Sequence, residues 1–199
     1  MPTSFSVANE TDLNNAIAQI DTGGASAATN TAYTITLTSG FTLGADLDAI
    51  NLESGSSLTI QGSNATINGG GVQRGFFVYS GTVAIDNLMI TNAVATGGAG
   101  GGIGAGGMGA GGALFVASGG NVTLSNVAFT GSSAIGGAGA VVGNFSGGEG
   151  GGGLGGNGAS GGGGVGLGAN GGTVRGNGGA GIILGAAAGG GGRRRYRWC

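Results

Sequence analysis

The chain lacks lysine and histidine altogether. All six basic residues are therefore arginine, and four of them lie in residues 193–199. Without histidine, neither a Ser-His-Asp triad nor a histidine metal site can form. Without lysine, the phosphate-binding loop G-x-x-x-x-G-K is excluded. Residues 1–192 carry two arginines against eight acids, so we expect no nucleic-acid-binding surface, which needs clustered basic side chains.

Cysteine and long apolar runs are also scarce. Cys199 is the single cysteine, so the chain can form no disulfide within itself and cysteine does not indicate a redox compartment. The first residues, MPTSFS, contain neither a basic nor an apolar segment, so we expect no signal peptide. The longest apolar run, residues 180–188, is too short and too rich in glycine and alanine to span a bilayer.

Glycine, by contrast, is abundant and unevenly placed. Of the 55 glycines, 44 lie between Gly97 and Gly192. The first half has β-branched and aromatic residues to bury, whereas most of the second half offers alanine, isolated aliphatic residues and backbone. Glycine loses the most entropy on ordering, so a glycine-rich run must be held by backbone hydrogen bonds or stay flexible.

A short phrase recurs along the first 130 residues. Its four copies are TITL (34–37), SLTI (57–60), TVAI (82–85) and NVTL (121–124). Each copy alternates polar and apolar residues, as a half-buried strand does. The steps between Ile35, Leu58, Val83 and Val122 are 23, 25 and 39 residues. A period in the twenties indicates a solenoid.

The apolar residues of this phrase form the first set of pairs: Ile35/Leu37, Leu58/Ile60, Val83/Ile85 and Val122/Leu124. Two further sets of apolar pairs recur in the same order. The second set is Phe41/Leu43, Ala65/Ile67, Leu88/Ile90 and Val127/Phe129, and the third is Ile50/Leu52, Phe76/Val78 and Leu114/Val116. The pattern predicts a parallel solenoid with three short strands in each turn of about 23–26 residues. The long step is explained by the glycine-rich stretch 97–112, which we expect to be a loop insertion at one corner.

One helix is expected before the repeats. After a short entry strand at Phe5–Val7, residues 11–20 place Leu13, Ala16, Ile17 and Ile20 at helical spacing. Thr11 would cap this helix at its start, and Gly23-Gly24 would end it. A helix at this place would suit a lid over the open end of the solenoid, and the alternative is a helix packed on its side.

The expected corners and boundaries follow from the same spacing. Gly62, Asn87 and Asn126 occupy equivalent positions after the first strand of successive turns, where we expect left-handed backbone and stacked asparagines with a structural role. We expect residues 1–137 to form the solenoid with its cap. Residues 138–192 would be a glycine-rich extension or loop, with a further strand at 182–184, and residues 193–199 would be an arginine-rich tail.

Candidate chemistry is sparse. Asp86 follows a first-set strand, and its expected neighbours in adjacent turns are Gln61 and Ser125, so this position offers one carboxylate and no acid pair. Asp46 and Asp48 could bind a cation weakly, although a solvated loop fits them better.

The only arginine before residue 175 is Arg74. We expect it to form a surface ion pair with Glu53, worth under about 1 kcal/mol. We assign no catalytic, cofactor-binding or metal-binding residue and no cofactor.

Four stretches carry a resemblance to a known family: FSVANETDLNNAIAQI, SLTIQGSNATINGG, RGFFVYSGTVAIDNLMITNA and GGALFVASGGNVTLSNVAFTGSSAIGG. Together, over residues 4–137, they resemble the passenger of a bacterial autotransporter or a related large surface protein. The resemblance implies a right-handed parallel β-helix of the pectin-lyase-like type, exported and displayed at the outer membrane through a barrel domain that this chain does not contain. We therefore expect an N-terminal fragment, whose tail, RRRYRWC, is a frame-shifted or read-through end; a basic tail for nucleic acid or acidic lipid is the alternative.

Three hypotheses for function follow. The first is a non-enzymatic structural or adhesive module whose partners are surface glycans, surface proteins or further copies of itself. The second is a polysaccharide lyase or hydrolase, for which Asp86, Asp46 and Asp48 are the only candidates. The third is a carbohydrate- or ice-binding face, motivated by the threonine column Thr36, Thr59 and Thr123, which Ala84 interrupts.

Overall fold

The computed structural model describes residues 1–101 and 105–139. Within them the chain forms one helix, α1, and nine strands, β1 to β9. The described residues divide into two compact units: residues 1–95 and 111–134 make the first, and residues 96–101, 105–110 and 135–139 make the second. The parts of the sequence expected to form the extension beyond Gly139, the further strand at 182–184 and the tail 193–199 lie outside the described residues.

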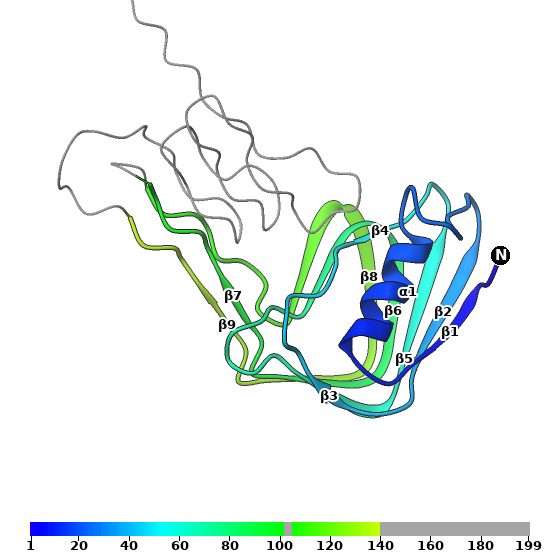
Figure 1. Cartoon of the computed structure of the whole chain (residues 1–199), viewed down its shortest axis with the longest axis horizontal. Coiled ribbons are helices and arrows are strands. Elements are labelled where there is room, and N and C mark those ends of the chain that lie inside the picture. Colours follow the sequence, from blue (N-terminus) through cyan, green and yellow to red (C-terminus); the bar gives the residue numbers. More distant parts are fainter. Residues whose placement is uncertain (102–104, 140–199) are drawn as a thin grey trace, which may run out of the picture. The chain divides into compact units, whose positions relative to one another are not determined.

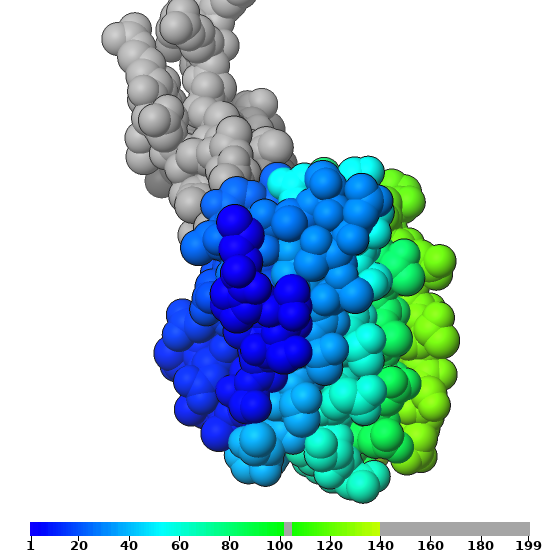
Figure 2. Space-filling model, turned by 90° about the vertical axis from the view of Figure 1, so that its right-hand side faces the viewer, coloured from blue at the N-terminus to red at the C-terminus, as the bar shows by residue number. Residues whose placement is uncertain are grey.

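A seven-stranded parallel sheet forms the first unit. Its strands are β1 (Ser4–Val7), β2 (Ala32–Leu37), β3 (Phe41–Thr42), β4 (Ile50–Asn51), β5 (Ser57–Asn68), β6 (Phe76–Thr91) and β8 (Leu114–Thr130). β2, β5, β6 and β8 lie side by side in chain order, and β1 pairs with β2. Figure 2 shows successive parts of the chain as neighbouring bands of colour. The expected mainly-β class with parallel strands is confirmed.

The register of the long strands follows the predicted spacing. In the first set, Leu58 of β5, Val83 of β6 and Val122 of β8 lie opposite one another, as predicted. Ile60, Ile85 and Leu124 do the same. The second set pairs as predicted between the same three strands, and the third set pairs as predicted between β6 and β8. The step of 39 residues into β8 therefore leaves the alignment intact.

The register of the earliest strands differs from the prediction by two residues. Ile35 lies opposite Ile60 rather than Leu58, and Tyr33 takes the position opposite Leu58. Tyr33 is buried, and its hydroxyl donates a hydrogen bond of 2.7 Å to the carbonyl oxygen of Ser26. A shift of two residues keeps every side chain on its own face, so alternation alone cannot distinguish the two registers. Phe41 and Ile50 are shifted in the same way, opposite Ile67 and Val78.

The core of the first unit is made of stacked aliphatic side chains, but burial stops at the last strand. Val78, Ile85 and Ile90 of β6 are 0% exposed. Their partners in β8, Val116, Leu124 and Phe129, are 40%, 42% and 43% exposed. β8 thus lies at an end of the stack where side chains of core type face solvent.

The helix α1 (Glu10–Ile20) buries its apolar face in this core through Leu13, Ala16, Ile17 and Ile20. Its N-cap is Asn9, whose side chain accepts a hydrogen bond of 2.9 Å from the backbone N–H of Asp12, so the expected cap at Thr11 is wrong by two positions. Asp21 rather than glycine occupies the C-cap. Among the described residues, no helix has the length and apolar character needed to cross a membrane.

Hydrogen bonds fasten α1 to the segment before β4. Glu10 accepts from the backbone N–H groups of Gly44 and Ala45, and the Oδ1 of Asn14 accepts from the backbone N–H of Asp48 at 2.9 Å. On its other side α1 contacts β1 and β2. The helix therefore closes the core next to the first strands of the sheet.

The corners confirm part of the asparagine prediction. Asn87 and Asn126 have left-handed backbone, with φ of 53° and 52°, and the amide nitrogen of Asn126 donates to Oδ1 of Asn87 at 2.8 Å. Gly62 is not left-handed, because the β5 corner contains three residues where β6 has only Asn87. There the positive φ angles fall on Ser63 and Asn64.

The second unit is built from glycine-rich backbone. Its described segments are joined by hydrogen bonds from Gly107 N–H to the Gly98 oxygen at 2.7 Å and from Gly137 N–H to the Gly107 oxygen at 2.8 Å. A Cβ atom on Gly106 would lie only 1.8 Å from the carbonyl oxygen of Gly137. β7 (Val94–Thr96) pairs with β9 (Ser133–Ile135) in a separate two-stranded sheet. Of the two alternatives expected for a glycine-rich run, these segments show the one with backbone hydrogen bonds.

Candidate functional site

The column around Asp86 contains one acid, as its spacing predicted. Gln61, Asp86 and Ser125 lie in register on β5, β6 and β8. The amide nitrogen of Gln61 donates to Oδ2 of Asp86 at 3.1 Å. General acid–base hydrolysis of glycosides uses two carboxyl groups, and this column supplies only one.

Asp46 and Asp48 are two residues apart but serve different neighbours. Oδ1 of Asp46 accepts from the backbone N–H of Arg74 at 2.8 Å, and Oδ2 lies 3.5 Å from the Arg74 Nε. Asp48 lies close enough to Asp21 to influence its titration, and burial raises the pKa of Asp48. These carboxylates therefore do not converge on one cation site.

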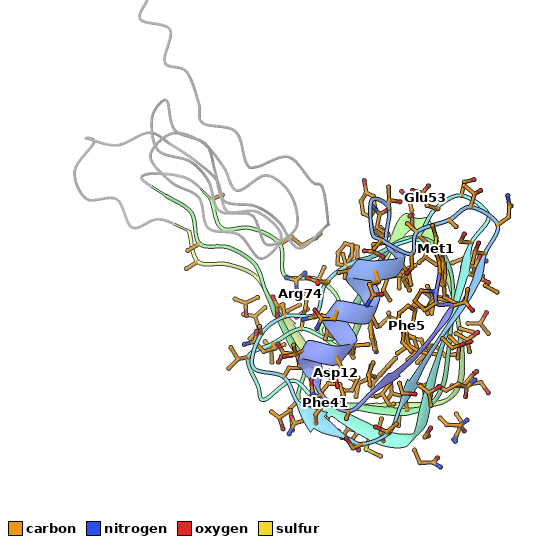
Figure 3. The ribbon with its side chains drawn as sticks, turned by 45° about the vertical axis from the view of Figure 1, so that its right-hand side comes forward. Met1, Phe5, Asp12, Phe41, Glu53 and Arg74 are labelled. Carbon is orange, nitrogen blue, oxygen red and sulfur yellow. The ribbon has the colours of Figure 1, made fainter. Side chains whose placement is uncertain are left out.

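The expected ion pair between Arg74 and Glu53 is wrong. Arg74 is only 2% exposed and faces Asp46, and Figure 3 places it well away from Glu53. Its Nε and Nη1 atoms have no hydrogen-bond partner. Sequence spacing suggested Glu53 because it lies one repeat earlier, but the residue that approaches the guanidinium comes from the loop between β3 and β4.

Asp21 is a buried acid whose role is not visible in the sequence. It is 1% exposed, and its Oδ1 accepts from the backbone N–H of Asn51 at 2.8 Å. Burial is the main cause that raises its pKa to about 7, and the nearby Asp48 carboxylate adds to the increase. Because solvent does not reach this carboxyl group, it links α1 to β4 rather than meeting a substrate. No sequence signal distinguishes it from an ordinary acid after a helix.

The first unit contains a groove of about 720 Å³ at the corner before the strand segments that begin with Ser57, Thr82 and Asn121. Three successive corners contribute its walls and floor. The lining residues are Leu52, Glu53, Ser54, Gly55, Ser56, Ser57, Ser80, Gly81, Thr82, Ser118, Gly119, Gly120 and Asn121. Its volume is within the range of 300–1,000 Å³ that is typical of small-molecule sites.

A difference in corner length creates the groove. Asn51 pairs with Ser80, and Ser57 pairs with Thr82, so five residues span the first corner where Gly81 alone spans the next. The longer corner forms a turn in which the Ser56 N–H donates to the Glu53 oxygen at 3.0 Å. This longer turn and the shorter corners beside it together line the groove. A Cβ on Gly81, whose φ is 102°, would approach Leu52 to 2.8 Å. The short corner therefore has glycine at this position, and no side chain fills the groove there.

Polar groups of two kinds line the groove. Ser56 and Ser80 are committed to the protein: the Ser56 hydroxyl donates to the Ala28 oxygen at 2.6 Å, and the Ser80 hydroxyl lies 2.8 Å from Oδ1 of Asn51. Other side chains in the lining have no hydrogen-bond partner among the described residues: Glu53, Ser54, Ser57, Thr82, Ser118 and Asn121. Glu53 is the single charged group. The groove thus offers donors and acceptors around one negative charge.

No cluster of three or more potential metal-binding side chains occurs in residues 1–101 and 105–139. The groove contains one carboxylate, which is too few for a calcium cage of six to eight oxygens without further ligands. Comparisons of the chain with protein families, with curated protein sequences and with solved structures found no match.

Proposed function

We propose that the parallel strands of the first unit are successive coils of a right-handed, single-stranded parallel β-helix. The repeated pairing of β5, β6 and β8 over their whole length supports this architecture. Right-handed crossovers are strongly preferred between parallel strands of one sheet, which supports the hand. α1 would be its N-terminal cap, since solenoid ends need a cover over their unpaired backbone and open core.

The module would be non-catalytic and adhesive, part of a bacterial surface protein of autotransporter type. A β-helix presents its corners on a rigid stack, which suits recognition of a ligand at a fixed place. The observation that carries this function is the polar groove, where partnerless hydroxyl and amide groups face solvent in three adjacent corners. We place the protein outside the cell on the resemblance of residues 4–137.

The ligand class that fits the groove is a neutral oligosaccharide. Sugar hydroxyls both donate and accept, and the lining offers serine, threonine and asparagine side chains that do the same. Glu53 would accept from sugar hydroxyls and repel uronic acids, phosphates and nucleic acids. The polysaccharide lyase or hydrolase is the less supported alternative, since Asp86, Asp46 and Asp48 have separate surroundings.

Glycan binding is the direct test. We expect the full chain to bind neutral oligosaccharides on a glycan array, with affinities then measured by calorimetry. Combining Thr82→Val with Asn121→Ala removes two sets of hydrogen bonds and should weaken binding about tenfold. Thr130→Val is the matched control, because Thr130 is an exposed threonine of β8 outside the groove.

Two outcomes would refute this function. One is an array without any neutral glycan ligand, and the other is a ligand whose affinity is the same for the Thr82/Asn121 variant and the wild type. Release of unsaturated product from polygalacturonate with Ca²⁺ would instead support the lyase alternative.

A further inference from the structure

The outer edge of β8 carries no strand among the described residues. β8 is 17 residues long, and 14 of these residues pair with β6, on one side only. Its sequence, LFVASGGNVTLSNVAFT, contains neither a charged residue nor proline. Natural edge strands are normally protected by such residues, because an unprotected edge pairs readily with another strand. Leu124 and Phe129 also remain more than two-fifths exposed beside this edge.

The rest of the sequence offers a poor match for the edge. In residues 140–199 the longest run of large aliphatic residues is Ile182–Leu184, and no copy of the alternating phrase occurs. That run could meet at most one of the three apolar pairs of β8. The first-set and second-set residues of β8, which include Leu124 and Phe129, would stay uncovered. The β8 strand of a second copy of the chain has the same length and the same apolar pattern as the edge it would cover.

We propose that two copies of this chain pair edge to edge through residues 121–125 of β8. The free edge faces away from β6, so a second copy can present its own free edge only after being turned over. This places the two strands antiparallel about a two-fold axis, the commonest symmetry of protein dimers. Pairing β8 with the β1 edge instead would engage only the four residues of β1. Asn121 belongs both to this segment and to the groove, so glycan binding is to be measured at concentrations where the chain is monomeric; the pairing itself does not rest on the proposed function.

The side-chain pattern places the axis at Thr123. Thr123 then faces its own copy, Val122 faces Leu124 of the second copy, and Asn121 faces Ser125 of the second copy. Apolar side chains thus meet apolar ones and polar meet polar, as cross-strand pairs prefer. The segment is bounded by a register irregularity before Gly119 and by the left-handed Asn126. Residues 119–125 are therefore in continuous register with β6, and residues 121–125 are the part of them centred on Thr123.

Sedimentation velocity over a dilution series of the full chain tests the association. We expect a monomer–dimer equilibrium that Leu124→Lys weakens about tenfold or more, because a charge would lie in the paired apolar row. Met89→Lys is the matched control, since Met89 is also 42% exposed but lies on the inner strand β6. Circular dichroism of both variants checks that each is folded.

Disulfide cross-linking tests the axis. In a Cys199→Ser background, Thr123→Cys should form a cross-linked dimer on mild oxidation, and Ala128→Cys, five residues from the axis, should not. A wild-type chain that is monomeric at every dilution would overturn the proposal, as would equal effects of Leu124→Lys and Met89→Lys. A monomer whose unfolding midpoint falls with Ile183→Lys would assign the edge to residues 182–184 instead.

Discussion

Buried aliphatic side chains fill the unit of residues 1–95 and 111–134, whereas the described part of the second unit has almost none to bury. In the first unit, residues such as Leu13 and Ile85 are 0% exposed within stacked layers. In the second, Gly98, Gly107 and Gly137 are joined directly through their backbones. One unit is thus stabilised mainly by removal of apolar surface from water, and the other by close backbone packing and hydrogen bonds.

The two arrangements should tolerate substitution differently. A side-chain core loses stability in proportion to the volume removed, because neighbouring groups relax only in part. At a contact between glycine backbones there is no side chain to remove, and an added Cβ atom would clash with the neighbouring backbone. In the second unit, the effect of a substitution should therefore depend on which glycine is replaced rather than on the size of the new side chain.

The largest effect should come from pH, and only in the first unit. The pKa of Asp21 is about 7 in the folded chain, above its ordinary value of 3.8. Its contribution to stability is full below about pH 4 and is lost as pH rises through 7, to a total of about 4 kcal/mol. Asp21→Asn should remove most of this loss in urea unfolding measured between pH 4 and 8.

The Asp21 comparison has an internal control. The described residues of the second unit contain no titratable side chain, so hydrogen exchange at Gly107 and Gly137, corrected for the intrinsic rate, should not follow the same pH profile. A wild-type unfolding free energy that is flat from pH 4 to 8 would contradict the buried carboxyl assignment.

A smaller effect on the unfolding free energy should distinguish the part of the first unit covered by α1 from the exposed strand β8. Leu13→Ala empties a site that is 0% exposed and should lower the unfolding free energy by about 3 kcal/mol. Leu124→Ala removes the same atoms from a residue that is 42% exposed and should cost under about 1 kcal/mol at concentrations where the chain is monomeric. Chemical denaturation of both variants measures the difference, and equal costs would show that β8 is covered in solution.

The smallest effect on global stability, and the most local one, should come from the second unit. Gly106→Ala places a Cβ 1.8 Å from the Gly137 oxygen and should abolish protection of the Gly137 amide from hydrogen exchange. Gly136→Ala is the control, because its Cβ would meet nothing nearer than 3.9 Å. Equal protection in the two variants would mean that these backbones do not pack in solution.

The sequence predicted the parallel sheet and most of its register because aliphatic residues recur at matching steps in β5, β6 and β8. It failed at β2, where Tyr33, Ile35 and Leu37 all alternate and two registers satisfy the same face. Tyr33, which lies opposite Leu58, donates a hydrogen bond from its hydroxyl to the carbonyl oxygen of Ser26, a residue of a loop that has no repeat. Helix α1 was predicted from its apolar spacing, but its capping residue was not.

The candidate site was less predictable than the fold. The isolation of Asp86 followed from the register. The groove did not, because it arises from unequal corners on neighbouring strands, and the partner of Arg74 did not, because Asp46 reaches it from a loop. The high pKa of Asp21 likewise depends on burial by α1 and β4, which no local pattern in the sequence records.

The corner between Asn51 and Ser57 has a consequence for engineering. It is four residues longer than the corner between Ser80 and Thr82, yet Leu58 and Val83 still lie opposite each other. Corner length is thus uncoupled from strand alignment at this place. A foreign peptide inserted beside the exposed Ser54, with the buried Ser56 and its hydrogen bonds retained, should lengthen this corner without shifting the strands beneath it, which makes the turn an attachment point for designed epitopes.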